Sequence, residues 1–147
     1  MFVVSTAYGA TDFEQDLELA NFGNSGAQFR VGARYLNGEG VEKNYVLALE
    51  WLSKAAAQNH ANALYNLGYM NLYGVGVPVD FVKAAEYFHK SKDGGFLPAW
   101  HILSVMYYDG AGVEKNIKKA KEYCKKAADG GYEPAKKMLE RGIFDSK

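Results

Sequence analysis

Hydrophobic positions recur along this chain at helical spacing, and they define helices that come in pairs. The first helix of the first pair is expected from about Ala27 to Leu36, because apolar residues four positions apart share one side of a helix. That side carries Ala27, Val31 and Tyr35. The second helix has an apolar stripe with the spacing i, i+3, i+4, i+7, which is typical of a face turned toward a core. The members of this stripe are Ala48, Trp51, Leu52 and Ala55.

Residues suited to helix ends fall between the apolar stripes. Gly38 fits the left-handed position that ends a helix, since glycine has no Cβ to clash there. Each second helix is expected to begin after a residue whose side-chain oxygen accepts a hydrogen bond from an unpaired backbone N–H. These residues are Asn44, Asp80 and Asn116. Pro98 and Pro134 fit the first turn of a helix, where a missing N–H costs nothing. The local signals therefore predict antiparallel helix hairpins.

The chain aligns with itself when it is shifted by 36 residues, and three copies match without a gap. Seven columns are identical in all three copies. They are Ala27/Ala63/Ala99, Gly38/Gly74/Gly110, Gly40/Gly76/Gly112, Val41/Val77/Val113, Ala48/Ala84/Ala120, Glu50/Glu86/Glu122 and Lys54/Lys90/Lys126. A repeat period between about 20 and 50 residues is typical of a solenoid, whose units bury their apolar faces only against neighbouring units.

Two motifs recur in the copies, and they carry a family resemblance. The first copy holds Gly38-Glu39-Gly40-Val41 and Trp51-Leu52-Ser53-Lys54-Ala55-Ala56. Over residues 25–132 the unit resembles the Sel-1-like repeats, which are relatives of the tetratricopeptide repeats. The chain departs from that pattern at Ser104, which replaces a helix glycine, at Asn71, which replaces a tyrosine, and at Ser91-Lys92, which replaces two alanines.

The periodicity and the resemblance together predict the fold and the division of the chain. We expect an all-α fold, a right-handed α/α superhelical solenoid of three 36-residue helix-turn-helix repeats with capping helices. The expected segments are an N-terminal tail (1–10), an N-terminal capping helix (11–24), three repeats (25–132) and a C-terminal capping helix (133–147). The N-terminal helix is expected to cover the apolar side of the first repeat with Phe13, Leu17, Ala20 and Phe22.

Composition and the first ten residues narrow the class of protein. The 17 basic and 17 acidic residues cancel, which argues against a generally basic nucleic-acid binder. No segment approaches the roughly 18 apolar residues that a membrane span needs. The start of the chain, with its small-x-small pattern Ala7-Tyr8-Gly9, leaves two interpretations open. It is either a short tail, compatible with a cytoplasmic protein, or the remnant of an export signal, which favours a periplasmic or secreted protein.

No residue pattern in the sequence points to catalysis, a cofactor or a metal. The Gly-x-Gly pairs do not complete a phosphate-binding motif, and they recur at one repeat position as structural glycines do. The three histidines, His60, His89 and His101, lack the paired spacing of zinc ligands. Cys124 falls in an apolar column of the repeat and is expected to be a buried, unreactive thiol. We therefore expect neither enzymatic activity nor a bound cofactor or metal.

A second line of residues follows the first helix of each copy, away from its core side. In the tetratricopeptide superhelix, which these repeats resemble, the corresponding positions face the concave groove where partners bind. The line consists of Phe29, Ala33, Leu36, Tyr65, Tyr69, Leu72, His101, Val105 and Tyr108. Because solvated helix faces are usually polar, this apolar line has two interpretations. Its members pack against the next repeat, or they form a contiguous trough that binds a partner.

The trough and the resemblance predict a non-catalytic protein–protein interaction scaffold or adaptor, which binds a peptide or partner protein on its concave aromatic face. The alternative is an inhibitor or immunity-type regulator that caps a specific secreted enzyme, as bacterial proteins resembling this family sometimes do. Charge is uneven, with four acidic and no basic residues in 1–24 but ten basic and six acidic residues in 111–147. Such ends keep a monomer solvated, bind an acidic partner at the basic end, or allow weak head-to-tail association.

Overall fold

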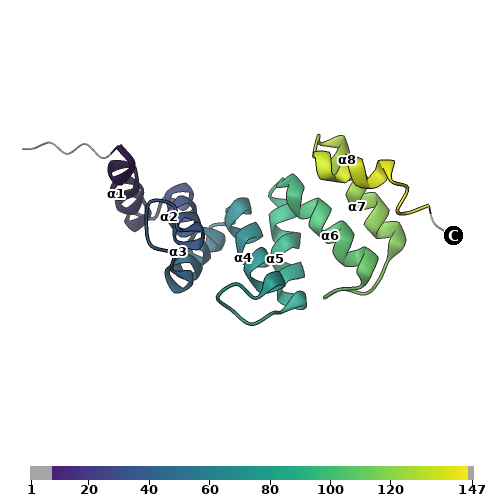
Figure 1. The fold of residues 1–147 in the computed structure, drawn as a ribbon, viewed down its shortest axis with the longest axis horizontal. Coiled ribbons are helices and arrows are strands. Elements are labelled where there is room, and N and C mark those ends of the chain that lie inside the picture. The colour runs from purple at the N-terminus through teal and green to yellow at the C-terminus, as the bar shows by residue number, and fades with distance from the viewer. Residues whose placement is uncertain (1–7, 146–147) are drawn as a thin grey trace, which may run out of the picture.

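The computed structural model describes residues 8–145 and contains eight α-helices and no β-strand in that range. In chain order they are α1 (Tyr8–Asn21), α2 (Ser25–Asn37), α3 (Tyr45–Ala57), α4 (Ala61–Tyr73), α5 (Phe81–Asp93), α6 (Leu97–Asp109), α7 (Ile117–Asp129) and α8 (Glu133–Glu140). Figure 1 shows them following one another along an elongated molecule, from α1 at one end to α8 at the other. The predicted all-α solenoid is confirmed.

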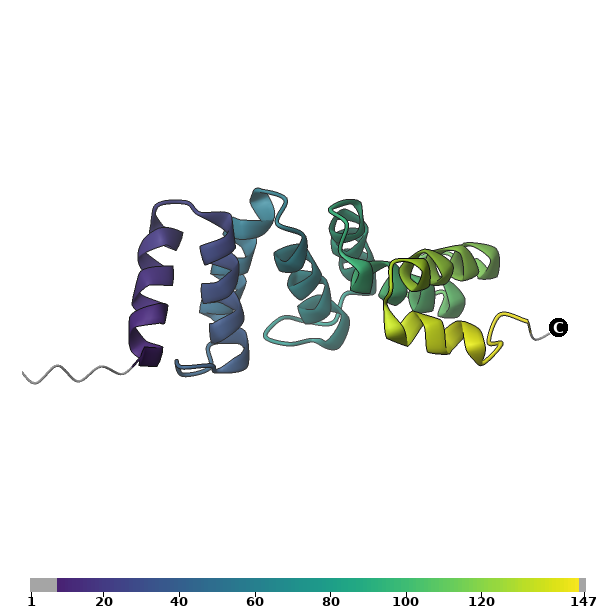
Figure 2. The same cartoon turned by 90° about the horizontal axis from the view of Figure 1, so that it is seen from above.

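Each helix packs mainly against the helices before and after it in the chain. The three predicted hairpins are α2 with α3, α4 with α5 and α6 with α7, and Figure 2 shows them stacked along the same axis. The first helices of consecutive repeats also touch directly where α2 meets α4. Within the described residues no helix is long and apolar enough to cross a membrane.

The helix ends follow the predicted capping chemistry. The side chains of Asn44, Asp80 and Asn116 accept hydrogen bonds from backbone N–H groups in the first turns of α3, α5 and α7, at 2.9–3.0 Å. Gly38 ends α2 with a φ of 74°, and Gly74 and Gly110 end α4 and α6 in the same left-handed conformation. The capping residues predicted from the repeat are therefore the ones that begin and end these helices.

The two helices of a repeat approach closely at one glycine, and the third repeat replaces that glycine without loss of packing. A Cβ at Gly68 would lie 2.7–2.9 Å from ring atoms of Phe88, and a Cβ at Gly32 would lie 2.8 Å from Leu52. In the third repeat the facing residue is the smaller Cys124, so that Ser104 fits. Its hydroxyl donates to the Ala120 carbonyl at 2.7 Å, and this bond satisfies a fully buried polar group.

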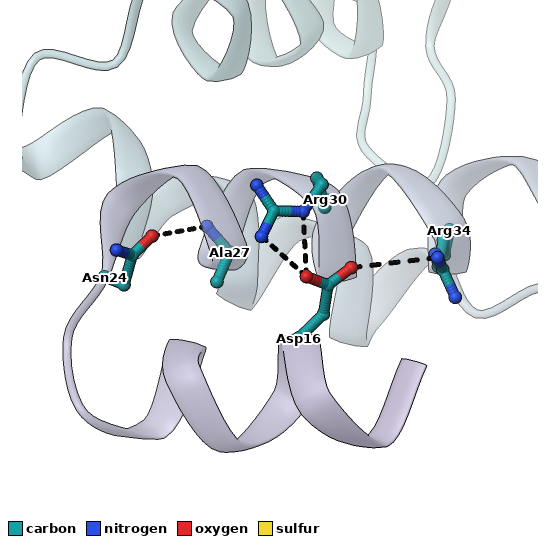
Figure 3. A network of polar contacts seen from close by, with 5 residues as sticks. All are labelled: Asp16, Asn24, Ala27, Arg30 and Arg34. Atoms are coloured by element: carbon teal, nitrogen blue, oxygen red, sulfur yellow. Dashed lines mark hydrogen bonds and ion pairs between the residues drawn. The ribbon is translucent and has the colours of Figure 1, made fainter. Parts of the chain in front are cut away.

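Helix α1 covers the first repeat, and an ion pair links it to α2. Phe13 and Leu17 pack against the core cluster of the first repeat, and Ala20 is buried there. Asp16 is buried as well, and its Oδ1 accepts hydrogen bonds from Nε and Nη2 of Arg30 at 2.8 and 2.6 Å. Figure 3 shows this carboxylate between Arg30 and Arg34, whose Nη2 lies 3.7 Å from Oδ2.

Two expectations about the N-terminal region are wrong. Phe22 does not contribute to the cap, since it lies in the turn after α1 with 83% of its surface exposed. Helix α1 begins at Tyr8 and so includes three residues of the segment predicted as a tail. Residues 1–7, and with them most of the supposed signal remnant, lie outside the described residues, as do residues 146–147 of the C-terminal segment.

Candidate functional site

The nine residues predicted to line a partner-binding face lie on α2, α4 and α6, three on each helix. Tyr69 is the one exposed member of this set, with 42% of its surface accessible, and the other eight are half-buried. We call the set the first-helix face. Its partial burial means that each repeat uses part of the face to contact its neighbour, as one of the two interpretations of the sequence expected.

Phe29, Tyr65 and His101, which occupy one repeat position, make the same contact in each repeat. Each ring packs against an aromatic residue that immediately precedes the next first helix. The pairs are Phe29–His60, Tyr65–Phe96 and His101–Tyr132, with ring centroids 4.9, 5.0 and 5.4 Å apart. This column therefore joins consecutive repeats, and its three side chains are half-buried.

The third position of the first-helix face also contacts the core. Leu36 packs against the cluster formed by α3 and α4, while Leu72 and Tyr108 pack against the cluster formed by α5, α6 and α7. The Tyr108 ring also meets Phe144 edge-on at 5.9 Å. These side chains give the face an apolar floor, and they are poor choices for mutations meant to change binding alone.

The exposed part of the face centres on two tyrosines of α4. Tyr69 packs against Tyr73, whose ring centroid lies 4.6 Å away and whose surface is 57% exposed. Beside them a crevice of about 380 Å³ opens between α2 and α4, lined by Leu36, Tyr45 and Tyr69 among others. Sequence reasoning missed Tyr73. The sequence does distinguish this position, because Tyr73 stands where the other two repeats hold the polar residues Asn37 and Asp109.

His101 and Val105 lie in a separate pocket of about 480 Å³ between α6 and α8. The pocket is lined by apolar residues, including Met138 and Ile143, and by Lys137 and Arg141 of the C-terminal helix region. The first-helix face is thus divided into an exposed tyrosine crevice and a more basic pocket nearer the C-terminus.

The three histidines and the cysteine have different surroundings. Burial of the ring lowers the pKa of His60, of His89 and of His101 below the ordinary value, and each histidine has a different environment. Burial also raises the pKa of the Cys124 thiol, whose Sγ lies 3.4 Å from the Ala135 carbonyl oxygen. Within residues 8–145 no three His, Cys, Asp or Glu side chains come together as a metal site.

The family model described as Sel1 repeat matches residues 25–60, 61–96 and 101–132. Comparison with curated proteins gives no match. Among solved structures, the Sel1 repeat protein from Oxalobacter formigenes is 37% identical with a TM-score of 0.80, over 88% of this chain and 98% of that one. The protective antigen c5321 of uropathogenic Escherichia coli strains, which displays an SLR fold, is 30% identical with a TM-score of 0.85.

The match to c5321 covers 90% of this chain but only 28% of that protein. A further match is cysteine rich protein B of Helicobacter pylori, at 26% identity and a TM-score of 0.71, over 86% of this chain and 94% of that one. These structures share the same stacking of helix pairs. The matched repeats account for most of the described chain.

Proposed function

Because the chain belongs to the Sel1 repeat family, whose members are generally protein-interaction modules, we propose that it is a non-catalytic scaffold that binds a partner protein or peptide on its first-helix face. The observation that carries the proposal is the exposed pair Tyr69 and Tyr73 beside the crevice between α2 and α4. Tyrosine gives a large contact area together with a polar hydroxyl, and it is enriched where binding energy is concentrated.

The experiment is affinity capture from cells of the source organism with the wild type and the variant Tyr69→Ala/Tyr73→Ala. Tyr65 is left intact because its ring packs against Phe88 and Phe96, so that its removal would weaken the fold. The two exposed tyrosines are expected to contribute little to stability, roughly 0.5 kcal/mol or less each. Circular dichroism and thermal unfolding establish that the variant folds.

A matched control is Val46→Ala/Val82→Ala, which removes two exposed apolar side chains from the second helices α3 and α5. The wild type and this control are expected to recover the same partner, and the tyrosine variant is expected to lose it. Equal recovery by all three proteins would show that the exposed pair Tyr69 and Tyr73 does not bind the partner. The inhibitor alternative predicts in addition that the recovered protein is one enzyme, whose activity falls to zero at an equimolar ratio.

A further inference from the structure

The pocket between α6 and α8 exists because the first-helix face carries smaller side chains here than one repeat earlier. His101 and Val105 occupy the positions that Tyr65 and Tyr69 hold on α4. The replacement of a tyrosine by a valine leaves room beside α8, and the pocket of about 480 Å³ falls in the size range of ligand sites. Its apolar part is formed by Val105, Met138 and Ile143, all half-buried.

The polar groups of the pocket favour an acidic occupant. His101 also lines the pocket, but its unpartnered Nδ1 atom is buried and is not presented to an occupant. Lys137 and Arg141 lie one helical turn apart in the lining, and neither forms an ion pair with another residue in 8–145. The acidic residue of the lining, Glu133, is already paired with Lys136 at 2.7 Å.

We propose that this pocket binds an acidic residue of the partner together with an adjacent aromatic or aliphatic side chain. The carboxylate would lie between Lys137 and Arg141, while the apolar side chain packs on Val105 and Met138. The inference deepens the proposed function and rests on it, because the occupant is a segment of a protein. Lys137 and Arg141 are exposed at the rim, which suits a side chain presented by a second molecule.

Short peptides added to the ¹⁵N-labelled full chain test the proposal by amide chemical shifts. The probes are acetyl-Gly-Gly-Asp-Phe-Gly-Gly-amide and its Phe-Asp counterpart. At least one is expected to give saturable shifts at the amides of Val105, Met138 and Ile143. Because Lys137 and Arg141 are exposed and their ion pairs are screened by solvent, replacing Asp by Asn is expected to weaken binding severalfold. Failure of both peptides, or equal binding of the Asn peptides, overturns the proposal.

Variants of the pocket locate the binding. Arg141→Gln and Lys137→Gln are each expected to weaken the peptide severalfold, whereas Lys125→Gln, an exposed lysine on α7, is the matched control and is expected to have no effect. His101→Tyr restores the residue found at Tyr65 and is expected to fill the pocket and abolish the shifts. Peptide binding that survives all three pocket variants would mean that the peptide binds elsewhere.

A third probe separates a protein partner from a small molecule. Phenylacetate carries the same carboxylate and ring without a peptide backbone, and it is expected to bind more weakly than the better peptide. Tighter binding of phenylacetate at the same amides would overturn the assignment to a protein segment. These outcomes are independent of capture through Tyr69 and Tyr73. If the peptides fail while capture depends on those tyrosines, the proposed function stands and the pocket assignment falls.

Discussion

The imidazole of His60 stacks on the ring of Phe29, with centroids 4.9 Å apart and ring planes within 18° of parallel. His60 precedes α4, and its Nδ1 accepts a hydrogen bond from the Ala63 N–H at 3.4 Å. One side chain thus caps a helix of the second repeat and packs on a helix of the first. A neutral ring suits the cap, because a protonated Nδ1 cannot accept a hydrogen bond.

Stability is expected to fall as the pH drops from 7.5 toward 5. Burial lowers the pKa of His60, so that the unfolded chain takes up a proton near its ordinary pKa of about 6.5 while the folded chain does not. The unfolded state is then favoured as the pH falls through about 6.5, and this loss stops below the lower pKa of the folded state. Burial lowers the pKa of His89 and His101 in the same direction. Thermal unfolding at a series of pH values measures the effect.

The variant His60→Phe isolates the contribution of one histidine. Phe96 holds the equivalent position before α6 and caps that helix without a side-chain hydrogen bond, so phenylalanine is compatible with this turn. We expect the variant to fold and to lose less stability than the wild type between pH 7.5 and 5. An unchanged pH dependence would mean that His60 does not resist protonation in the folded chain.

The variant Gly68→Ala is expected to destabilise the protein by about 1–3 kcal/mol, even though alanine is a better helix former. The added Cβ would lie 2.7–2.9 Å from the Phe88 ring, which is fully buried and cannot move without disturbing its neighbours. Urea unfolding followed by circular dichroism measures the change in the free energy of unfolding.

Gly26→Ala is the control, because a Cβ there would lie 3.4 Å or more from its nearest neighbours, an ordinary contact. It is expected to leave stability unchanged or slightly higher. The double variant Gly68→Ser/Phe88→Cys reproduces the pair Ser104 and Cys124 of the third repeat, and it is expected to lose less stability than the two single changes added together. If Gly68→Ala were as stable as Gly26→Ala, the space between α4 and α5 at Gly68 would be large enough for a Cβ, contrary to the distances given above.

The repeat period predicted the fold because the residues that begin and end each helix act locally and recur in every repeat. Gly38 and Asn44 end and begin helices through their own backbone and side-chain geometry, and the same signals appear 36 residues later. The exposure of the first-helix face could not be predicted this way. Phe29 is covered by His60, 31 residues away, and the pocket beside Val105 depends on α8, which follows the last complete repeat.

Cys124 is expected to react slowly with thiol reagents in the folded protein. Its side chain is fully buried and burial raises its pKa, so that little reactive thiolate is present and reagents cannot reach it. The rate of reaction with 5,5′-dithiobis(2-nitrobenzoate) is expected to be at least about tenfold lower than that of an exposed cysteine. The comparison uses Ser53→Cys, an exposed position on α3, which should add a fast phase to the slow one. A wild-type thiol that reacts in the fast phase would contradict the burial.

Asp16 is expected to hold α1 on the first repeat, and Asp16→Asn should weaken that attachment. The substitution removes the charge that pairs with Arg30 at 2.6 Å, while the side-chain volume stays nearly the same. Because the Arg30 side chain is 49% exposed, the pair is screened by solvent, and the cost is expected to be only about 1 kcal/mol. For a chain of this size the melting temperature should fall by roughly 2–4 °C.

The control is Asp12→Asn, which changes an exposed position on the same helix and should leave the melting temperature unchanged. Equal melting temperatures for the two variants would show that the ion pair does not fix α1.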